Sequence, residues 1–131
     1  MQANRSVSAP EIIFRRALWA DGSCGFRRGV RLPGKPDVIF SAARVAIFVN
    51  GCYWHRCPIC RLPEPQSNAD FWRSKFKANL RRDEIAVSTL AAAGWTVMTV
   101  WEHEIRNDVA RAARRTNALV AEMREVRRWT G

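Results

Sequence analysis

Three cysteines in one polar stretch of the chain have the spacing of a metal site. They read Cys52-x4-Cys57-x2-Cys60, and thiolates at this spacing can share one tetrahedral Zn²⁺, which prefers four nitrogen or sulfur ligands. A site closed by a fourth ligand has a structural role. The alternative interpretation is a redox Cys-x-x-Cys pair with a spare buried thiol, which is disfavoured because the motif has no strand-to-helix setting.

The fourth zinc ligand has to come from another part of the sequence, and there are three candidates: His55, His103 and Cys24. We favour His103, because it directly follows a predicted strand, at an edge of the sheet that could meet the cysteine loop. His55 would crowd a short loop that already carries three ligands.

Asp37 and His55, the latter in a role other than zinc binding, indicate phosphate chemistry. Asp37 follows a glycine-containing turn and leads a predicted strand, where a carboxylate can bind Mg²⁺, a hard cation that takes few protein ligands. A plain turn aspartate is the alternative. His55 follows the next predicted strand by a short loop, so both groups could face one phosphate across the sheet edge. Histidine is the usual acceptor of a proton from water near neutral pH.

Aromatic side chains stand among cations in the same polar region. The aromatic residues are Tyr53, Trp54 and Trp72, and the interleaved cations are Arg56, Arg61, Arg73, Lys75 and Arg81. Flat side chains flanked by cations are suited to insertion between base steps, where partial unstacking kinks the duplex. We expect the other large aromatic residues in the core: Trp19, Trp95, Trp101 and Phe48.

The composition supports a nucleic-acid partner. The 131 residues include 22 Lys and Arg against 12 Asp and Glu, a formal charge of +10 that indicates a polyanionic ligand. An apolar content of 47% excludes a disordered chain. Because no apolar run approaches the roughly 20 residues of a membrane span or the length of a signal peptide, we expect a cytoplasmic protein. The length predicts a single domain over residues 1–131, with 1–7 as a candidate disordered end.

The elements that position these residues follow from periodicity and turn signals. We predict a helix over 9–20, a hairpin of strands 37–40 and 45–49, a helix over 70–92, a strand over 95–101, and a final helix capped by Asn107. The core stripe of the long helix is predicted to be Phe76, Leu80, Val87 and Leu90. Segment 50–68 has little periodicity, so something other than packing must order it. This order predicts an α/β fold with a mixed sheet flanked by helices on both faces.

These motifs resemble the very short patch repair (Vsr) DNA mismatch endonucleases. The resemblance covers roughly residues 8–106 and rests on Pro33-Gly34-Lys35-Pro36-Asp37, Phe48-Val49-Asn50-Gly51-Cys52-Tyr53-Trp54-His55, and the motifs that begin at Phe71 and Gly94. It implies a restriction-endonuclease-like fold with a structural zinc loop. It also implies Mg²⁺-dependent nicking of duplex DNA on the 5′ side of the thymine in a T·G mismatch left by deamination of 5-methylcytosine.

The resemblance further implies a role for each matching residue. Asp37 matches the metal-binding aspartate, His55 the histidine that activates water, and Glu11 an active-site glutamate. Val49 matches a position whose main-chain carbonyl holds the catalytic metal. The implied zinc ligands are Cys52, Cys57, Cys60 and His103, with histidine and cysteine exchanged between Cys57 and His103 relative to many members. The implied DNA contacts are Tyr53, Trp54 and Trp72 as intercalating residues, and Lys75 and Asn79 against the mismatched pair.

Partners and alternatives follow from the same resemblance. It implies a functional link to a cytosine-5 methyltransferase and to mismatch-repair proteins, and we expect a monomer because a nick needs only one active site. Asn50 stands where aspartate or histidine is common in the family. This departure leaves open a nuclease of the same fold that acts on other modified or mispaired DNA. The remaining alternative is a zinc-ordered DNA-binding module without catalysis.

Overall fold

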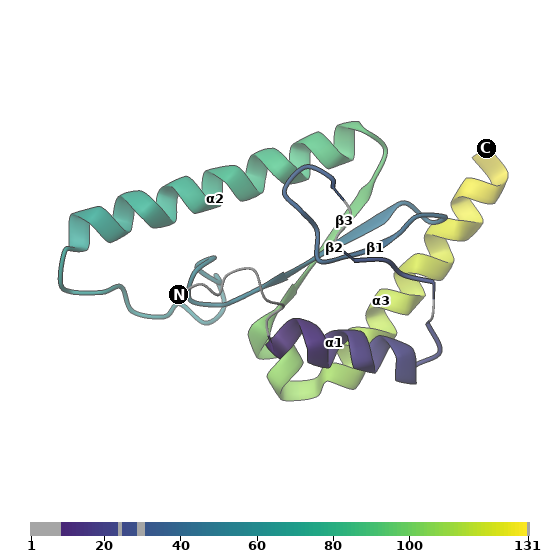
Figure 1. Ribbon diagram of the computed structural model, residues 1–131, viewed down its shortest axis with the longest axis horizontal. Coiled ribbons are helices and arrows are strands. Elements are labelled where there is room, and N and C mark those ends of the chain that lie inside the picture. Colours follow the sequence, from purple (N-terminus) through teal and green to yellow (C-terminus); the bar gives the residue numbers. More distant parts are fainter. Residues whose placement is uncertain (1–8, 24, 29–30, 131) are drawn as a thin grey trace.

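The computed structural model describes residues 9–23, 25–28 and 31–130. Its elements in chain order are α1 (Ala9–Ala20), β1 (Val38–Phe40), β2 (Val45–Asn50), α2 (Ala69–Ala92), β3 (Thr96–Trp101) and α3 (Glu102–Thr130) (Figure 1). Every predicted helix and strand is therefore present. The expectation about residues 1–7 and the candidate ligand Cys24 lie outside the described residues.

The three strands form one mixed sheet in the order β1-β2-β3. β1 and β2 are the predicted antiparallel hairpin, with Val38 opposite Ile47. β3 returns beside β2 in the parallel direction, with Val49 opposite Val100. A parallel neighbour requires a long crossover, and α2 supplies it. The ends of β2 and β3 consequently meet at one edge, where the cysteine loop and α3 begin.

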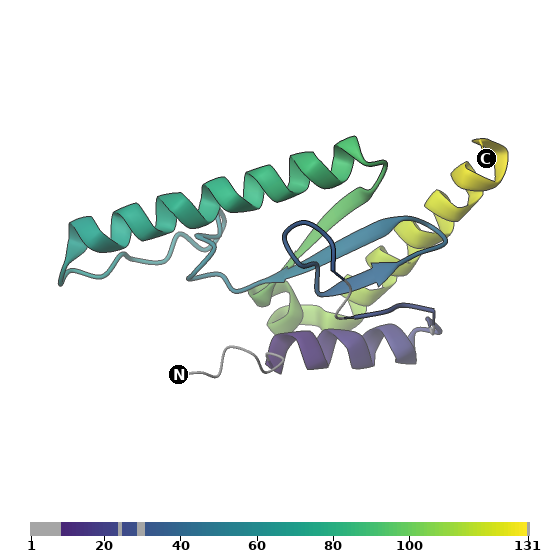
Figure 2. The same ribbon diagram turned by 45° about the horizontal axis from the view of Figure 1, so that its top comes forward.

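Helices cover both faces of the sheet, as predicted. Figures 1 and 2 show α2 on one side and α1 with the first part of α3 on the other. Side chains alternate accordingly: Val38, Val45 and Ile47 belong to the core beneath α1 and α3, whereas Ile39 and Ala46 pack with Leu90 of α2. The fold is α/β with two apolar layers around one small sheet.

Only part of the long helix α2 lies across the sheet, and the N-terminal half of the helix extends beyond the sheet (Figure 1). Gly94 follows the helix with φ 92°, a left-handed conformation that glycine adopts without strain. The predicted core stripe is half wrong. Phe76 and Leu90 are buried, but Leu80 and Val87 are 40% and 39% exposed, because they line a hollow beside the sheet edge instead of facing its centre.

The final helix differs from its prediction at its start. Helical turns begin at Glu102, directly after β3, and the backbone breaks at Asp108, where φ is −163° and ψ is 81°. The Asp108 carboxylate accepts a hydrogen bond from the amide of Arg111 at 3.1 Å, so Asp108 caps the second part of the helix and the prediction of Asn107 was wrong by one residue.

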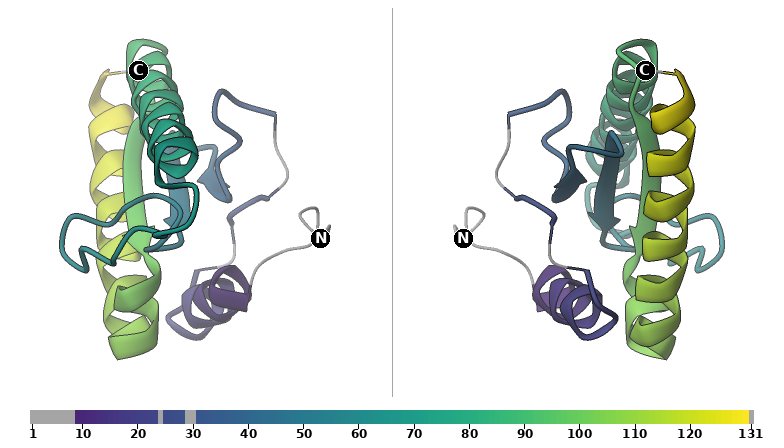
Figure 3. Two further views of the ribbon diagram at one scale, coloured as in Figure 1. Left: turned by 90° about the vertical axis from the view of Figure 1, so that its left-hand side faces the viewer. Right: turned by 90° about the vertical axis from the view of Figure 1, so that its right-hand side faces the viewer.

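The outer surface of the fold corrects one further expectation. Figure 3 shows α1 packed beside the first part of α3, and this packing leaves Trp19 of α1 58% exposed rather than in the core. Trp95 and Phe48 do pack against the core between the sheet and α2, as expected. Among the described residues, no helix has both the length and the apolar character needed to cross a membrane.

Candidate active site and zinc site

Asp37 is fixed at the head of β1 by the backbone of β2. Its own amide donates to the carbonyl of Ile47 at 2.9 Å, and its carboxylate oxygen Oδ2 accepts a hydrogen bond from the amide of Val49 at 2.7 Å. The preceding turn lies tightly against α2, because a Cβ added at Gly34 would come within 2.5 Å of the Ala86 Cβ. Gly34 also has φ 77°, so glycine meets both requirements of this turn.

Glu11 of α1 brings a second carboxyl group to Asp37. Glu11 is buried, and burial followed by the negative charge of Asp37 raises the pKa of Glu11 from its ordinary 4.5 to about 7. Burial likewise raises the pKa of Asp37, against the hydrogen bond from the Val49 amide, which lowers it. Two carboxyl groups that repel each other in a partly buried site are suited to an added cation. Their hard oxygen atoms match the preference of Mg²⁺.

His55 lies in the loop after β2 and makes a contact that the sequence did not predict. Its Nδ1 is 2.8 Å from Oδ2 of Asp83 on α2, and the two side chains are 32% and 40% exposed. His55 also lies close enough to Asp37 for its charge to lower the pKa of that carboxyl group. When Nδ1 carries the proton toward Asp83, Nε2 holds the lone pair and can accept a proton.

Asp83 was missed because nothing in its sequence position distinguishes it from the other charged residues of a long exposed helix. A usable signal was its spacing: it lies four residues after Asn79, and therefore on the same face of α2. Asn79 itself was predicted only as a DNA contact, through the resemblance to the family.

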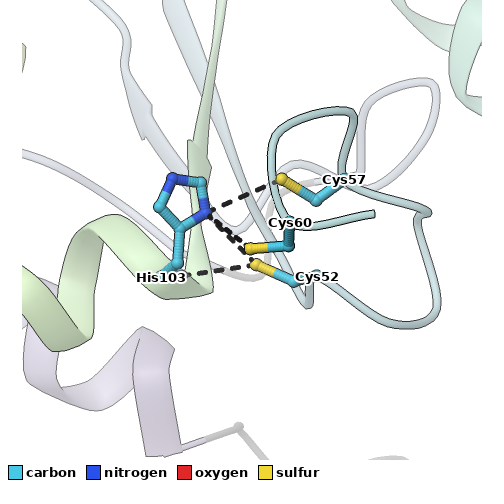
Figure 4. A group of neighbouring side chains, drawn as sticks. All are labelled: Cys52, Cys57, Cys60 and His103. Atoms are coloured by element: carbon cyan, nitrogen blue, oxygen red, sulfur yellow. Dashed lines mark hydrogen bonds between the residues drawn. The ribbon is translucent and has the colours of Figure 1, made fainter. Parts of the chain in front are cut away.

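The predicted zinc ligands converge on one point (Figure 4). The ligand atoms of Cys52, Cys57, Cys60 and His103 all lie within 4.8 Å of one another. From Nδ1 of His103, the sulfur atoms are at 3.4 Å for Cys52, 3.6 Å for Cys57 and 3.4 Å for Cys60. Tetrahedral bonds of the lengths usual for zinc place nitrogen and sulfur ligands about 3.6 Å apart. The donor set and its spacing therefore fit Zn²⁺.

The same cluster ties the cysteine loop to the sheet edge. The amide of Cys52 donates to the Glu102 carboxylate at 3.3 Å, and the amide of His103 donates to the sulfur of Cys52 at 3.4 Å. Burial raises the pKa of the Cys52 thiol to about 11, so without a cation this thiol retains a proton that zinc would displace. The choice of His103 over His55 is consistent with this geometry, since His55 faces Asp83 instead.

The aromatic residues form one cluster between the cysteine loop and the projecting half of α2. The ring of Trp54 lies 5.8 Å from Trp72 and 5.0 Å from Tyr53, measured between centroids. Phe76 closes the base of the cluster, and the guanidinium of Arg56 lies 4.5 Å from the centroid of its ring. Trp54 remains 51% exposed. The cluster thus presents flat apolar surface to solvent on a molecule with a formal charge of +10.

Lys75 and Asn79 lie on α2 between Trp72 of the aromatic cluster and Asp83. Asn79 accepts a hydrogen bond at Oδ1 from the guanidinium of Arg82. A cavity of about 370 Å³ continues from there, between α2, the turn before β1 and the ends of β2 and β3. Arg82, Asp83, Lys35 and Asn50 are among its lining residues. The helix therefore carries a run of polar side chains from the aromatic cluster to the contact of His55.

Comparison with known proteins connects this arrangement to DNA cleavage. Residues 1–60 match the family model described as DNA mismatch endonuclease Vsr. The type II nicking enzyme V.XorIIP of Xanthomonas oryzae pv. oryzae is 43% identical over 125 residues, which cover 91% of this chain and 88% of that protein. The type II nicking enzyme V.NaeI of Lentzea aerocolonigenes is 40% identical over 118 residues, which cover 86% of this chain and 70% of that protein.

A further similar protein carries the family description itself. The DNA mismatch endonuclease Vsr of Escherichia coli K12 is 37% identical over 75 residues, which cover 57% of this chain and 48% of that enzyme.

Proposed function

Since this chain belongs to the DNA mismatch endonuclease Vsr family and is a DNA endonuclease, we propose that it nicks duplex DNA at T·G mismatches. The nick lies on the 5′ side of the thymine, and the mismatch is the one left by deamination of 5-methylcytosine. The observation that carries the proposal is the meeting of Glu11, Asp37 and His55 at one sheet edge, with His55 held by Asp83.

The carboxyl pair supports a Mg²⁺ requirement. Asp37 would hold the metal ion through its carboxylate and Val49 through its main-chain carbonyl. Glu11 of α1 would bind the ion directly or through a water molecule. When bound, Mg²⁺ polarises the scissile phosphate and offsets charge on the leaving 3′ oxygen. Asp37 is well suited to this role because the Val49 amide already fixes one of its oxygen atoms at 2.7 Å, so little side-chain freedom is lost on binding.

His55 would take the proton from the attacking water. The contact of its Nδ1 with Asp83 at 2.8 Å selects the tautomer with a basic Nε2 and fixes the ring plane. As the proton arrives, the Asp83 carboxylate stabilises the imidazolium. Asp83 acts through His55 and is a positioning residue. The products would be a 5′ phosphate and a 3′ hydroxyl.

Recognition of the mismatch would use the aromatic cluster and α2. Tyr53, Trp54 and Trp72 would insert beside the mispaired bases, where stacking is weakest. Lys75 and Asn79 would then contact the bases from the helix. The zinc cluster supports this arrangement mechanically, because Cys52, Tyr53, Trp54 and His55 are consecutive and a single metal site orders all four.

The family's biology suggests what supplies the substrate. Deamination of 5-methylcytosine requires a cytosine-5 methyltransferase to make the methylated base, and we propose that this chain works on the sites of such an enzyme, alongside mismatch-repair proteins, as a monomer.

One observation favours an alternative substrate, namely other mispaired or modified DNA. Asn50 lines the cavity beside Asp83, at the position where acidic or histidine side chains are common in the family, and an amide there fits a nuclease that acts on other mispaired or modified DNA. The interpretation as a non-catalytic DNA-binding module is set aside, because the chain is a DNA endonuclease.

A panel of end-labelled duplexes that differ at one base pair separates these substrates. The panel contains T·G, each other mispair, T·A and C·G in the same flanking sequence, with several flanks tested for T·G. The proposal predicts a Mg²⁺-dependent nick in the thymine strand of the T·G duplex alone. Nicking of another mispair with equal or greater rate would instead favour the alternative substrate.

A further inference from the structure

We propose that Arg82 determines specificity by fixing the side-chain amide of Asn79, so that only hydrogen-bond donors face the mismatched pair. This inference rests on the proposed function, because it concerns how the pair is read. It assigns a role to a residue to which the resemblance gives none.

The contact that carries the inference lies on the surface of α2. The guanidinium Nη2 of Arg82 donates to Oδ1 of Asn79, and residues three apart on a helix are neighbours, so the contact needs no distortion of the backbone. Arg82 is exposed and lines the same cavity as Asp83. It therefore lies between the residue that would read the bases and the residue that holds His55.

The chemistry of the two side chains makes this contact directional. An arginine has five N–H donors and no acceptor, whereas an asparagine amide has an acceptor at one end and two donors at the other. Only Oδ1 of Asn79 can face the guanidinium, so its NH₂ group turns away from Arg82. Without Arg82 the amide can rotate and present either end to a base.

A surface with donors only would distinguish T·G from every normal pair. In the major groove, which admits an α-helix, adenine and cytosine each present an amino donor, whereas thymine presents O4 and guanine presents O6 and N7, all acceptors. A T·A or C·G pair therefore always places one donor in this groove, and T·G places none. The Lys75 ammonium has donors only, and Arg82 gives Asn79 the same character. The pair of reading residues then matches T·G and opposes an amino group.

The test compares discrimination rather than activity alone. Dissociation constants for T·G, T·A and C·G duplexes are measured in EDTA, where no cleavage intervenes, and single-turnover nicking of T·G is measured in Mg²⁺. The variants are Arg82→Ala, Arg82→Lys, Asn79→Ala and the double variant Arg82→Ala/Asn79→Ala. Arg81→Ala is the matched control, because it removes an equal charge from the neighbouring exposed position of α2.

We expect Arg82→Ala to lower the preference for T·G over T·A about tenfold, as loss of a base-reading contact does. The double variant should lose no more preference than Asn79→Ala, since Arg82 acts through Asn79. Arg82→Lys should retain part of the preference, because an ammonium can also donate to Oδ1. Arg81→Ala should weaken binding to all duplexes equally.

Three results would overturn the inference. These are full preference for T·G in Arg82→Ala, a loss in Arg82→Ala that is equal for all duplexes, as expected of a simple phosphate contact, and additive losses in the double variant. A wild-type protein without preference for T·G would instead refute the proposed function from which the inference starts. The two failures are thus distinguished by the wild-type measurement.

Discussion

Nδ1 of His55, in the cysteine loop, lies 2.8 Å from Oδ2 of Asp83, on the long helix α2. The contact joins two segments that are held in place in different ways. The loop of His55 is tied together at the cluster of Cys52, Cys57, Cys60 and His103, whereas α2 packs on the sheet. Because Asn79 is one helical turn before Asp83, one helix carries both the proposed base-reading residue and the residue that contacts the proposed general base.

Replacing Asp83 by asparagine should slow nicking while leaving DNA binding intact. An amide can offer Nδ1 a donor or an acceptor, so it no longer selects the tautomer with a basic Nε2 or stabilises the imidazolium. The same Asp-to-Asn change beside the catalytic histidine of a serine protease lowers kcat about 10⁴-fold, and we expect a loss of at least about tenfold here. Single-turnover rates against pH, together with dissociation constants for the T·G duplex, measure the two effects. Unchanged rates in Asp83→Asn would remove Asp83 from the mechanism.

Zinc should be bound in an equimolar amount and should be needed for structure rather than for the chemical step. We expect Cys60→Ser to lose most of its zinc, to melt at a lower temperature and to bind the T·G duplex weakly, because the loop that carries Tyr53 to His55 loses its order. Elemental analysis and thermal melting measure this. Full zinc content in Cys60→Ser, or a wild-type protein purified without zinc, would contradict the assigned ligand set.

Stability of the metal-free protein should fall as the pH rises through the range set by Glu11. The pKa of Glu11 is raised from 4.5 to about 7, so between these values the folded chain binds a proton that the unfolded chain has released, and folding becomes less favourable with increasing pH. After allowance for solvent screening, the effect is about 1–2 kcal/mol.

The matched variant for this prediction is Glu11→Gln, which cannot ionise. Between pH 5 and pH 8 in EDTA, the free energy of unfolding of Glu11→Gln should fall less than that of the wild type. The expected difference between the two proteins is about 1–2 kcal/mol. Denaturant unfolding at the two pH values makes the comparison. An identical pH dependence in both proteins would show that Glu11 is not the titrating group.

Trp54→Ala and Trp72→Ala should weaken binding of the T·G duplex with little effect on stability. Stacking on a base contributes about 1–3 kcal/mol per aromatic residue, and Trp54 is already 51% exposed, so its loss removes little core packing. Trp19→Ala is the control, because Trp19 is a similarly exposed tryptophan, at 58%, on α1. Equal losses of affinity in all three variants would argue against an intercalating role for the cluster.

The sequence predicted the elements better than their contacts. Apolar periodicity and glycine positions located α1, α2 and the three strands because those signals are local. The burial of Leu80 and Val87 was predicted wrongly, since their exposure depends on how α2 crosses the sheet and on the hollow beside Asp83. Asp108 replaced Asn107 as the cap for a similar reason: the chain had already turned helical at Glu102, directly after β3.

In the candidate site, too, residues that are close in sequence were predicted better than contacts between distant elements. Cys52, Cys57 and Cys60 are close in sequence, and His103 could be selected by its place after a strand, so the cluster was predicted in full. The pairing of Asp37 with Glu11 came only from the resemblance to a family, because the two residues lie on different elements. The contact of His55 with Asp83 spans 28 residues, and no local pattern indicates it.

The most direct measurement of the proposed activity follows one labelled thymine strand in a T·G duplex and in its T·A counterpart. Wild-type protein and Asp37→Ala are compared in Mg²⁺ and in EDTA, with zinc content and melting temperature recorded for both proteins. We predict a single nick on the 5′ side of the mismatched thymine, made only by the wild type and only in Mg²⁺. Equal cutting of the T·A duplex, or an undiminished nick by a folded Asp37→Ala protein, would contradict the proposal.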